Sequence, residues 1–197
     1  MIDSKARKFY QIGLIEPLLK TNWIAHLSPV TLTLCALCLG LLIPCFLPLG
    51  HSYIALICLA LSGFCDTLDG SLARHRNIAS DVGAMLDITS DRLVEFAILL
   101  ALFLVDPTTR GLPCMLCMGS TLFCITTFLV VGIFSKNETE KSFYYSAGLI
   151  ERAEAFLFFG AMILFPSAFF TLAYLFSALV FLTGIFRVHE FLHQKKV

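Results

Sequence analysis

The sequence predicts an all-α integral membrane protein, with six transmembrane helices that follow an amphipathic helix at the membrane interface. Of its 197 residues, 58% are hydrophobic and only 14% are charged, and the mean hydropathy is +0.85. A soluble domain of this length needs far more polar surface. The apolar runs are also long enough, because about 20 helical residues span the roughly 30 Å of hydrocarbon in a bilayer.

The elements follow one another along the chain as an interfacial segment and then a bundle. Residues 1–22 mix cations with apolar side chains and suit a helix lying in the interface, with a poorly ordered tail as the alternative. Residues 23–192 are expected to form the bundle, and residues 1–197 are interpreted as a single domain. The fifth run is short and ends at Pro166, so the last two helices are expected to be tilted or closely paired. The six apolar runs cover residues 23–49, 51–72, 84–105, 112–135, 149–166 and 167–188.

The distribution of Lys and Arg predicts the orientation. In this topology 13 of the 14 cations fall on one side of the membrane, and only Arg110 falls on the other. The positive-inside rule therefore places both termini in the cytoplasm. Met1, Ile2 and Asp3 begin no apolar run with a cleavage site, so a removable signal peptide is not expected. The sequence indicates a multi-pass protein of the bacterial inner membrane.

The eight cysteines include two pairs with the spacing of half a zinc site or a redox pair. These pairs are Cys35 with Cys38 and Cys114 with Cys117. Both lie inside apolar runs, without a histidine or further thiol nearby to complete a tetrahedral set. We therefore interpret the cysteines as small apolar packing residues.

Four aspartates at fixed spacing lie where the second and third apolar runs meet. A carboxylate in a lipid-facing helix is costly, so it usually faces a functional cavity. Because glycines and a small residue recur in the same pattern, a bulky ligand can approach the backbone there. The pattern consists of Asp66, Asp69, Gly70, Ala73 and Arg74, followed after eight residues by Gly83, Asp87 and Asp91.

Helical periodicity puts these carboxylates on two facing surfaces. Asp66 and Asp69 share one arc of the second helix, and Asp87 and Asp91 share one face of the third. A short polar link joins the helices, so we expect them to pack antiparallel with their acidic faces converging near the cytoplasmic side. Hard oxygen donors suit Mg²⁺ or Mn²⁺. The alternative for each aspartate is a buried ion pair with Arg74, Arg76 or Arg92, but four unpaired carboxylates would repel one another without a cation. Glu95 is expected to support the site or to form a helix-end pair.

The full pattern resembles the signature of the CDP-alcohol phosphatidyltransferases, and all eight of its defining positions are present. The chain is also similar to this family in its length and in its six-helix layout. The resemblance implies an enzyme that moves a phosphatidyl group from CDP-diacylglycerol to a small alcohol and releases CMP. We see no Ser, Cys or His placed to form a phosphatidyl-enzyme. Direct in-line displacement is therefore expected.

The resemblance assigns roles to individual residues. By similarity, Asp66, Asp69, Asp87 and Asp91 hold two divalent ions, Mg²⁺ or Mn²⁺, and Asp91 is also the general base. Arg74 suits phosphate oxygens as a fork-shaped cation, although an interface anchor is its alternative role. The family often carries Pro-Asn-x-Leu-Thr at the start of its first membrane helix, but Val30 replaces the asparagine here. The residues expected to line the CDP-lipid site are Val30, Thr31, Leu32, Thr33, Gly70, Ala73, Arg74, Ser80 and Gly83.

The acceptor alcohol is predicted from a second polar cluster after the fourth helix. Lys136 and Arg152 are expected to bind an acceptor that carries its own phosphate; an ordinary positively charged cytoplasmic loop is the alternative. Family members that use inositol phosphate tend to carry arginines where this chain has Glu138 and Ala155. Glycerol 3-phosphate is therefore the first choice here. Inositol phosphate, inositol and other alcohols remain as alternatives.

Two other classes of protein share part of this pattern. Membrane prenyltransferases also pair aspartate motifs with Mg²⁺, but those chains are usually longer and lack the Gly-x-x-Ala-Arg element. A cation transporter also places carboxylates within the membrane, but no inverted repeat is evident here. The expected partners are CDP-diacylglycerol, a small polar alcohol and membrane lipid, without nucleic acid. The resemblance also implies a homodimer, with close helix contact at Ala84, Ala97, Ala101 and Gly119.

Overall fold

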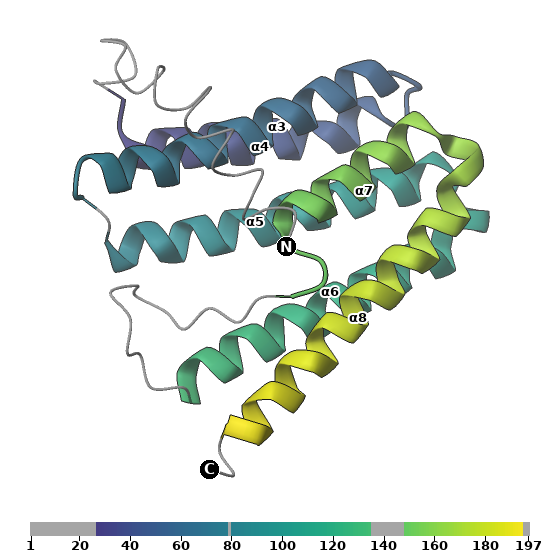
Figure 1. Ribbon diagram of the computed structural model, residues 1–197. Coiled ribbons are helices and arrows are strands. Elements are labelled where there is room, and N and C mark those ends of the chain that lie inside the picture. The colour runs from purple at the N-terminus through teal and green to yellow at the C-terminus, as the bar shows by residue number, and fades with distance from the viewer. Residues whose placement is uncertain (1–26, 79, 135–147, 195–197) are drawn as a thin grey trace. The chain divides into compact units, whose positions relative to one another are not determined.

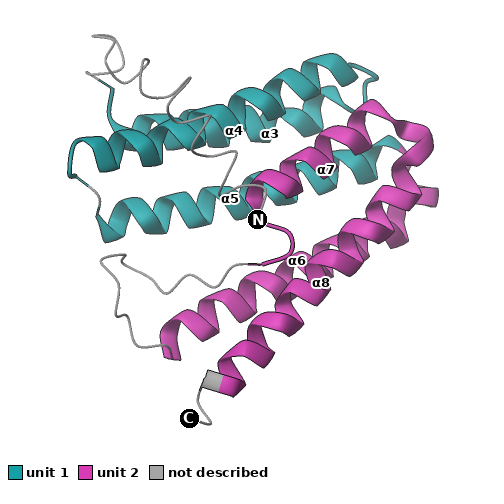
Figure 2. Cartoon of the chain, viewed as in Figure 1, with its two compact units in different colours: residues 1–105 teal, residues 106–197 magenta. Residues whose placement is uncertain are grey.

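The structure is a computed structural model that describes residues 27–78, 80–134 and 148–194. The described residues form six α-helices and one short 3₁₀ turn, and they contain no strand (Figure 1). The chain divides into two compact units, Met1–Val105 and Asp106–Val197 (Figure 2). The expected interfacial helix over residues 1–22 lies outside the described residues.

Four of the helical segments are long and apolar enough to cross a membrane. They are α3 (Pro29–Phe46), α4 (Ser52–His75), α6 (Pro107–Phe134) and the segment Pro166–His193 that contains most of α8 (Phe169–Gln194). The other two helices, α5 (Asp81–Val105) and α7 (Arg152–Leu164), do not meet this criterion. In α5 the charges of Asp91, Arg92 and Glu95 interrupt the apolar run, and α7 has only 13 residues, or about 20 Å of helix. The all-α membrane class is thus confirmed, and six complete membrane crossings stay a prediction.

The helix bounds agree with the apolar runs in the sequence. The predicted early end of the fifth run is confirmed, because α7 ends at Leu164 and a 3₁₀ turn, η3 (Pro166–Ala168), leads directly into α8. Proline at the first position of a helix fits because its missing N–H would have no helical partner there. All eight cysteines are free. Cys58, Cys114 and Cys117 are buried, as expected for packing residues, whereas Cys35, Cys38 and Cys45 are exposed.

In the first unit, α3 is the helix on which the other two pack. Its partners are α4 and α5, whereas the backbones of α4 and α5 scarcely approach each other. Gly40 allows the close contact with α5, since a Cβ atom there would lie 2.6 Å from Cγ2 of Val94. The Ser62 hydroxyl donates to the Ala36 carbonyl at 2.8 Å and joins α4 to α3. The expected antiparallel course of α4 and α5 is observed (Figure 1), but their backbone contact is slight and both helices pack mainly on α3.

The turn between α4 and α5 is fixed by backbone hydrogen bonds. Asn77 has a positive φ of 55°, its N–H donates to the Arg74 carbonyl at 3.1 Å, and the Ile78 N–H donates to the Ala73 carbonyl at 3.0 Å. This pair of bonds is the Schellman motif that ends many helices. Asparagine is one of the few residues other than glycine that tolerate this conformation. The turn therefore reverses the chain so that α5 runs back along the unit.

The second unit is built on α6 and α8, which pack along each other. Asp106 begins α6: its carboxylate accepts the Thr109 N–H at 3.2 Å and the hydroxyls of Thr108 and Thr109 at 2.7 Å each. These hydrogen bonds lower the pKa of Asp106 to about 2. The short α7 begins with a capping box between Glu151 and Glu154, and Phe159 of α7 packs on Phe176 of α8 with ring centroids 5.1 Å apart.

Replacing Asn77 tests the turn that aligns α4 with α5. We expect Asn77→Val to lower the free energy of unfolding by about 1–2 kcal/mol, because a β-branched residue is strained at positive φ. Asn77→Gly should leave it equal or higher. The measurement is SDS-induced unfolding of the purified protein followed by circular dichroism. A valine variant as stable as the glycine variant would contradict this account of the turn.

Candidate metal and CDP-lipid site

Three of the four motif aspartates converge in the first unit. Asp66 and Asp69 of α4 and Asp87 of α5 each present a carboxylate oxygen, and these oxygens lie within 4.8 Å of one another. Asp69 is buried, with 4% of its surface exposed, and the other two are half-buried. Such a set of hard oxygen donors fits a divalent cation. The convergence predicted from helical periodicity is therefore observed for these three residues.

The arrangement of the three helices explains this convergence. Asp66 and Asp69 are three residues apart, so they share one face of α4. Because α4 and α5 both pack on α3 while their backbones stay apart, carboxylates from the two helices can meet between them. Leu68 and Leu72 of α4 are buried against Leu32 of α3. This apolar contact fixes the rotation of α4 and thereby the direction in which its aspartates face.

Thr33 has a more specific position than the sequence indicated. Its hydroxyl lies 2.5 Å from Oδ2 of Asp69 and 3.1 Å from the Pro29 carbonyl oxygen. The single hydroxyl proton is best donated to the carboxylate, because hydrogen bonds to a charged acceptor are shorter and stronger. The structure thus shows that Thr33 hydrogen bonds to a carboxylate of the aspartate cluster, and its predicted contact with the CDP-lipid stays a prediction.

Asp91 is not one of the three carboxylates within mutual reach. It lies one helical turn beyond Asp87, which is about 6 Å along the axis of α5. Its Oδ2 is 4.0 Å from Nη2 of Arg92, and Nη1 of the same arginine is 2.6 Å from Oε2 of Glu95. Glu95 therefore forms an ion pair within α5 and not, as expected, at a helix end, and its supporting role at the site stays a prediction. The roles of Asp91 as fourth ligand and general base stay predictions.

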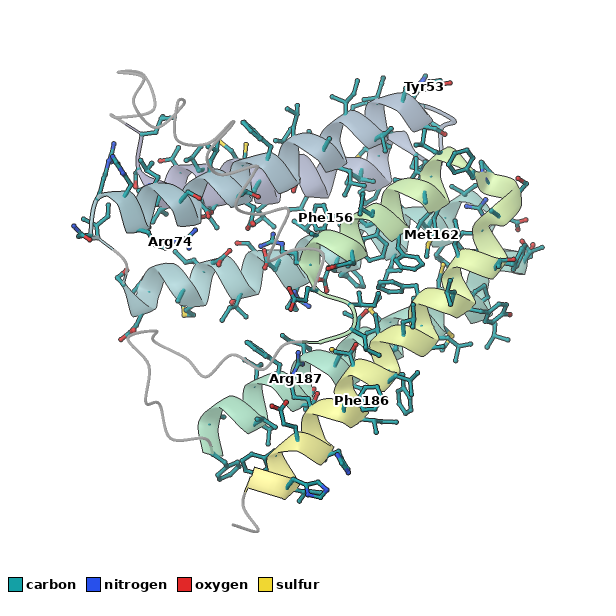
Figure 3. All side chains as sticks on the ribbon, in the orientation of Figure 1. Tyr53, Arg74, Phe156, Met162, Phe186 and Arg187 are labelled. Atoms are coloured by element: carbon teal, nitrogen blue, oxygen red, sulfur yellow. The ribbon has the colours of Figure 1, made fainter. Side chains whose placement is uncertain are left out.

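Gly70, Ser71 and Arg74 are arranged together near the end of α4. A Cβ atom at position 70 would lie 3.3 Å from Nη1 of Arg74, so the glycine leaves room for the guanidinium to fold back along the helix. Nη2 of Arg74 lies 3.4 Å from Oγ of Ser71. Figure 3 shows the Arg74 side chain on the side of α4 that faces α5. This placement puts a cation on the same side of α4 as the carboxylates.

Other expected CDP contacts have a structural task of their own. The Ser80 hydroxyl accepts the Gly83 N–H at 3.1 Å and so caps the start of α5. Leu32 is buried, with 7% of its surface exposed, so any contact with a nucleotide would have to come from its backbone. Val30 and Thr31 are exposed, and Ala73 is half-buried. Their predicted contacts with the CDP-lipid stay predictions.

The second unit contains the acceptor candidate Arg152 and one cation that sequence reasoning did not single out. Lys136 and Glu138 lie outside the described residues. Arg152 is the first residue of α7, with its guanidinium 5.6 Å from the Phe156 ring centroid. Arg187 of α8 is buried, donates to the Cys124 carbonyl at 3.0 Å and stacks 5.0 Å over the Phe128 ring (Figure 3). Its signal in the sequence was a single arginine within the last apolar run.

The start of α7 is held against α8 beside Arg187. The Ile150 N–H donates to Oγ1 of Thr183 at 3.3 Å. A Cβ atom at Gly148 would overlap Thr183 and lie 3.6 Å from Nη2 of Arg187. The segment that leads into Arg152 therefore runs along the surface of α8 next to the buried arginine.

Comparison with known proteins identifies the family. The chain belongs to the CDP-alcohol phosphatidyltransferase family, whose model matches residues 26–187. It is therefore an enzyme of phospholipid synthesis and a multi-pass membrane protein, and the alternatives of a prenyltransferase and a cation transporter are excluded.

Individual relatives are found in bacteria and archaea. The inner membrane protein YnjF of Escherichia coli is 34% identical over 173 residues, which cover 82% of each chain. Archaetidylinositol phosphate synthase of Pyrococcus horikoshii is 30% identical over 180 residues, or 89% of each chain. Phosphatidylinositol phosphate synthase of Corynebacterium glutamicum is 28% identical over 155 residues, covering 78% of this chain and 70% of that one.

A solved structure shares the fold. The crystal structure of Mycobacterium tuberculosis phosphatidylinositol phosphate synthase with CDP-DAG bound matches with a TM-score of 0.72 and 19% sequence identity. The match covers 90% of this chain and 93% of that chain. The chain therefore shares the fold of this solved structure.

The hydrogen bond from Thr33 to Asp69 can be tested through metal binding. We expect Thr33→Val to weaken Mn²⁺ binding about tenfold, since a hydrogen bond to a charged group contributes about 1.5 kcal/mol. Thr33→Ser, which keeps the hydroxyl, should bind nearly as well as the wild type. The measurement is Mn²⁺ titration of the purified protein followed by electron paramagnetic resonance.

A matched control is Thr126→Val. The Thr126 hydroxyl donates only to the Leu122 carbonyl of its own helix among the contacts described, so its loss should not change Mn²⁺ binding. Equal affinity of Thr33→Val and wild type would show that the hydroxyl does not position Asp69.

Proposed function

We propose that this protein transfers a phosphatidyl group from CDP-diacylglycerol to a phosphorylated polyol and releases CMP. The observation that carries the proposal is the convergence of Asp66, Asp69 and Asp87 within 4.8 Å, in a chain whose family model describes CDP-alcohol phosphatidyltransferases. A pyrophosphate substrate concentrates negative charge, and three carboxylates can accept such a substrate only together with cations.

The chain's own residues have separate tasks in the proposed reaction. Asp66, Asp69 and Asp87, together with Asp91, hold two divalent ions, and Thr33 orients Asp69. When bound, these ions neutralise the pyrophosphate and polarise its bond to the departing CMP. We assign Mg²⁺ or Mn²⁺ because all the donors are hard carboxylate oxygens.

The transfer itself needs a base and an anchor for the donor. Asp91 takes the proton of the acceptor hydroxyl as its oxygen attacks the phosphorus of the phosphatidyl group. The bond between this phosphorus and the oxygen of CMP breaks in the same in-line displacement. Arg74 binds phosphate oxygens of the CDP-lipid with its fork of N–H donors. The two substrates therefore meet on the faces of α4 and α5 that carry the carboxylates.

The proposed acceptor differs from the one that the sequence favoured. Glycerol 3-phosphate was our first choice, but relatives with a named activity are phosphatidylinositol phosphate and archaetidylinositol phosphate synthases. We therefore propose inositol phosphate. Arg152 and the buried Arg187, which lies beside the segment leading into α7, support an acceptor that carries a phosphate. One observation stands against this acceptor. Inositol phosphate enzymes tend to have an arginine at the position of Ala155, and the buried alanine cannot bind a phosphate in its place.

A panel of acceptors tests the proposed function. Purified protein is incubated with CDP-diacylglycerol and Mn²⁺ together with inositol phosphate, glycerol 3-phosphate, inositol or serine. We expect the fastest CMP release with inositol phosphate, and mass spectrometry should identify the matching lipid product. Asp66→Asn is the inactive control, because it removes an anionic ligand that compensates the charge of the pyrophosphate. Faster CMP release with glycerol 3-phosphate would contradict inositol phosphate as the acceptor. Full activity of Asp66→Asn would contradict the assignment of the aspartates as the metal site.

Arg152 should affect one substrate and not the other. We expect Arg152→Ala to raise the KM for the acceptor about ten- to a hundredfold, since a lost charge-assisted contact costs roughly 1.5–3 kcal/mol. The KM for CDP-diacylglycerol should change little. Arg74→Ala should do the reverse. Steady-state kinetics with each substrate varied in turn makes the comparison, and equal effects of Arg152→Ala on both substrates would indicate a structural role.

We also propose that all six helices cross the inner membrane, with both termini and the carboxylates on the cytoplasmic side. The charge distribution supports this orientation. Single cysteines placed at residues 78 and 108 of a cysteine-free variant would report it, since only the first should be labelled from the cytoplasm.

A homodimer is a further proposal, supported by the family resemblance. Among the four small residues expected at its interface, Ala97 and Ala101 are buried within the chain itself. They cannot form an outer contact surface. Ala84 and Gly119 are exposed, and Gly119 has open space where a Cβ atom would lie. Light scattering of the detergent-extracted protein would determine its oligomeric state.

A further inference from the structure

One arginine in α5 lies near two carboxylates and is much closer to one of them. Nη1 of Arg92 is 2.6 Å from Oε2 of Glu95, and its Nη2 is 4.0 Å from Oδ2 of Asp91. Glu95 is buried, with 6% of its surface exposed, whereas a third of the Arg92 side chain is exposed. The guanidinium is thus fixed at its Glu95 end and has only a long contact with Asp91.

The spacing along α5 explains this unequal sharing. Arg92 and Glu95 are three residues apart, so their side chains are neighbours on the helix surface. Asp91 directly precedes Arg92, and adjacent residues do not face each other on a helix. Attraction between opposite charges nevertheless acts over 4 Å and strengthens as they approach. A guanidinium no longer held by Glu95 can therefore rotate toward Asp91.

We propose that Glu95 is a positioning residue that holds Arg92 and prevents it from forming a close ion pair with Asp91. Arg92 then does not neutralise Asp91, whose carboxylate takes part in binding a metal ion and receiving the proton of the acceptor hydroxyl. This inference rests on the function proposed above, because it assigns Glu95 to the same site. Glu95 acts through Arg92 and does not itself contact the substrate.

A simpler role for the pair is structural. A buried carboxylate is costly without a partner, so Arg92 could serve only to stabilise Glu95 in the folded protein. Both roles predict that Glu95→Gln lowers the Tm. They differ in metal binding, because a purely structural pair leaves the affinity of the folded protein for Mn²⁺ unchanged.

The experiment measures Mn²⁺ binding and stability separately on the full-length protein in detergent. Electron paramagnetic resonance gives the Kd for Mn²⁺, and circular dichroism gives the Tm. We expect Glu95→Gln to weaken Mn²⁺ binding about tenfold and the double variant Arg92→Gln/Glu95→Gln to return within about twofold of wild type. The same double variant should recover CMP release relative to Glu95→Gln.

Asp81→Asn is the matched control. Asp81 is an exposed carboxylate at the start of the same helix, so its loss changes the charge of α5 by the same amount away from Arg92. Mn²⁺ binding by this variant should equal that of the wild type.

Two results would overturn the positioning role of Glu95. One is unchanged Mn²⁺ affinity in Glu95→Gln, and the other is a double variant that binds as weakly as Glu95→Gln. If Glu95→Gln fails to fold, Arg92→Gln decides: the inference requires Mn²⁺ binding at least as tight as wild type, and weaker binding overturns it. If the wild-type protein itself binds no Mn²⁺, the proposed function is contradicted. Failure of the proposed function therefore differs from failure of the role of Glu95, which shows only in the variants.

Discussion

The structure depends on the cost of placing carboxylates among apolar helices. Asp66, Asp69 and Asp87 each place a carboxylate oxygen within 4.8 Å of the others, and like charges at this distance repel one another. Such a cluster is stable when it binds cations, and this requirement relates the fold directly to a metal-dependent reaction on a pyrophosphate. The hydrogen bond from Thr33 and the ion pair of Glu95 with Arg92 are local arrangements that keep individual carboxylates oriented.

The helix α3 makes this cluster possible. Because α4 and α5 both pack on α3 and scarcely on each other, their carboxylates can face one another without the helices closing the space between them. Gly40 lets α5 approach α3 closely, and Leu32 packs against Leu68 and Leu72 of α4. A helix that carries no charge in its described residues thus decides the geometry of the charged site.

The second unit has a different chemistry. Its described residues include Arg152 at the start of α7 and the buried Arg187 in α8, and Ile150 and Gly148 hold the intervening chain against α8. A buried guanidinium bonded to a carbonyl and stacked on Phe128 has a fixed direction, which suits the recognition of a phosphate.

The sequence alone determined the helix positions, the membrane class and the family, because hydropathy and a long spaced motif depend only on the order of residues. It also predicted that Asp66, Asp69 and Asp87 would converge, since helical periodicity fixes which residues share a face. The tertiary structure decided what periodicity cannot: that α4 and α5 both pack on α3, that Thr33 bonds to Asp69, and that Asp91 lies one turn away beside Arg92. Thr33 and Asp69, for example, are 36 positions apart. Their geometry follows from how side chains pack, which local sequence patterns do not contain.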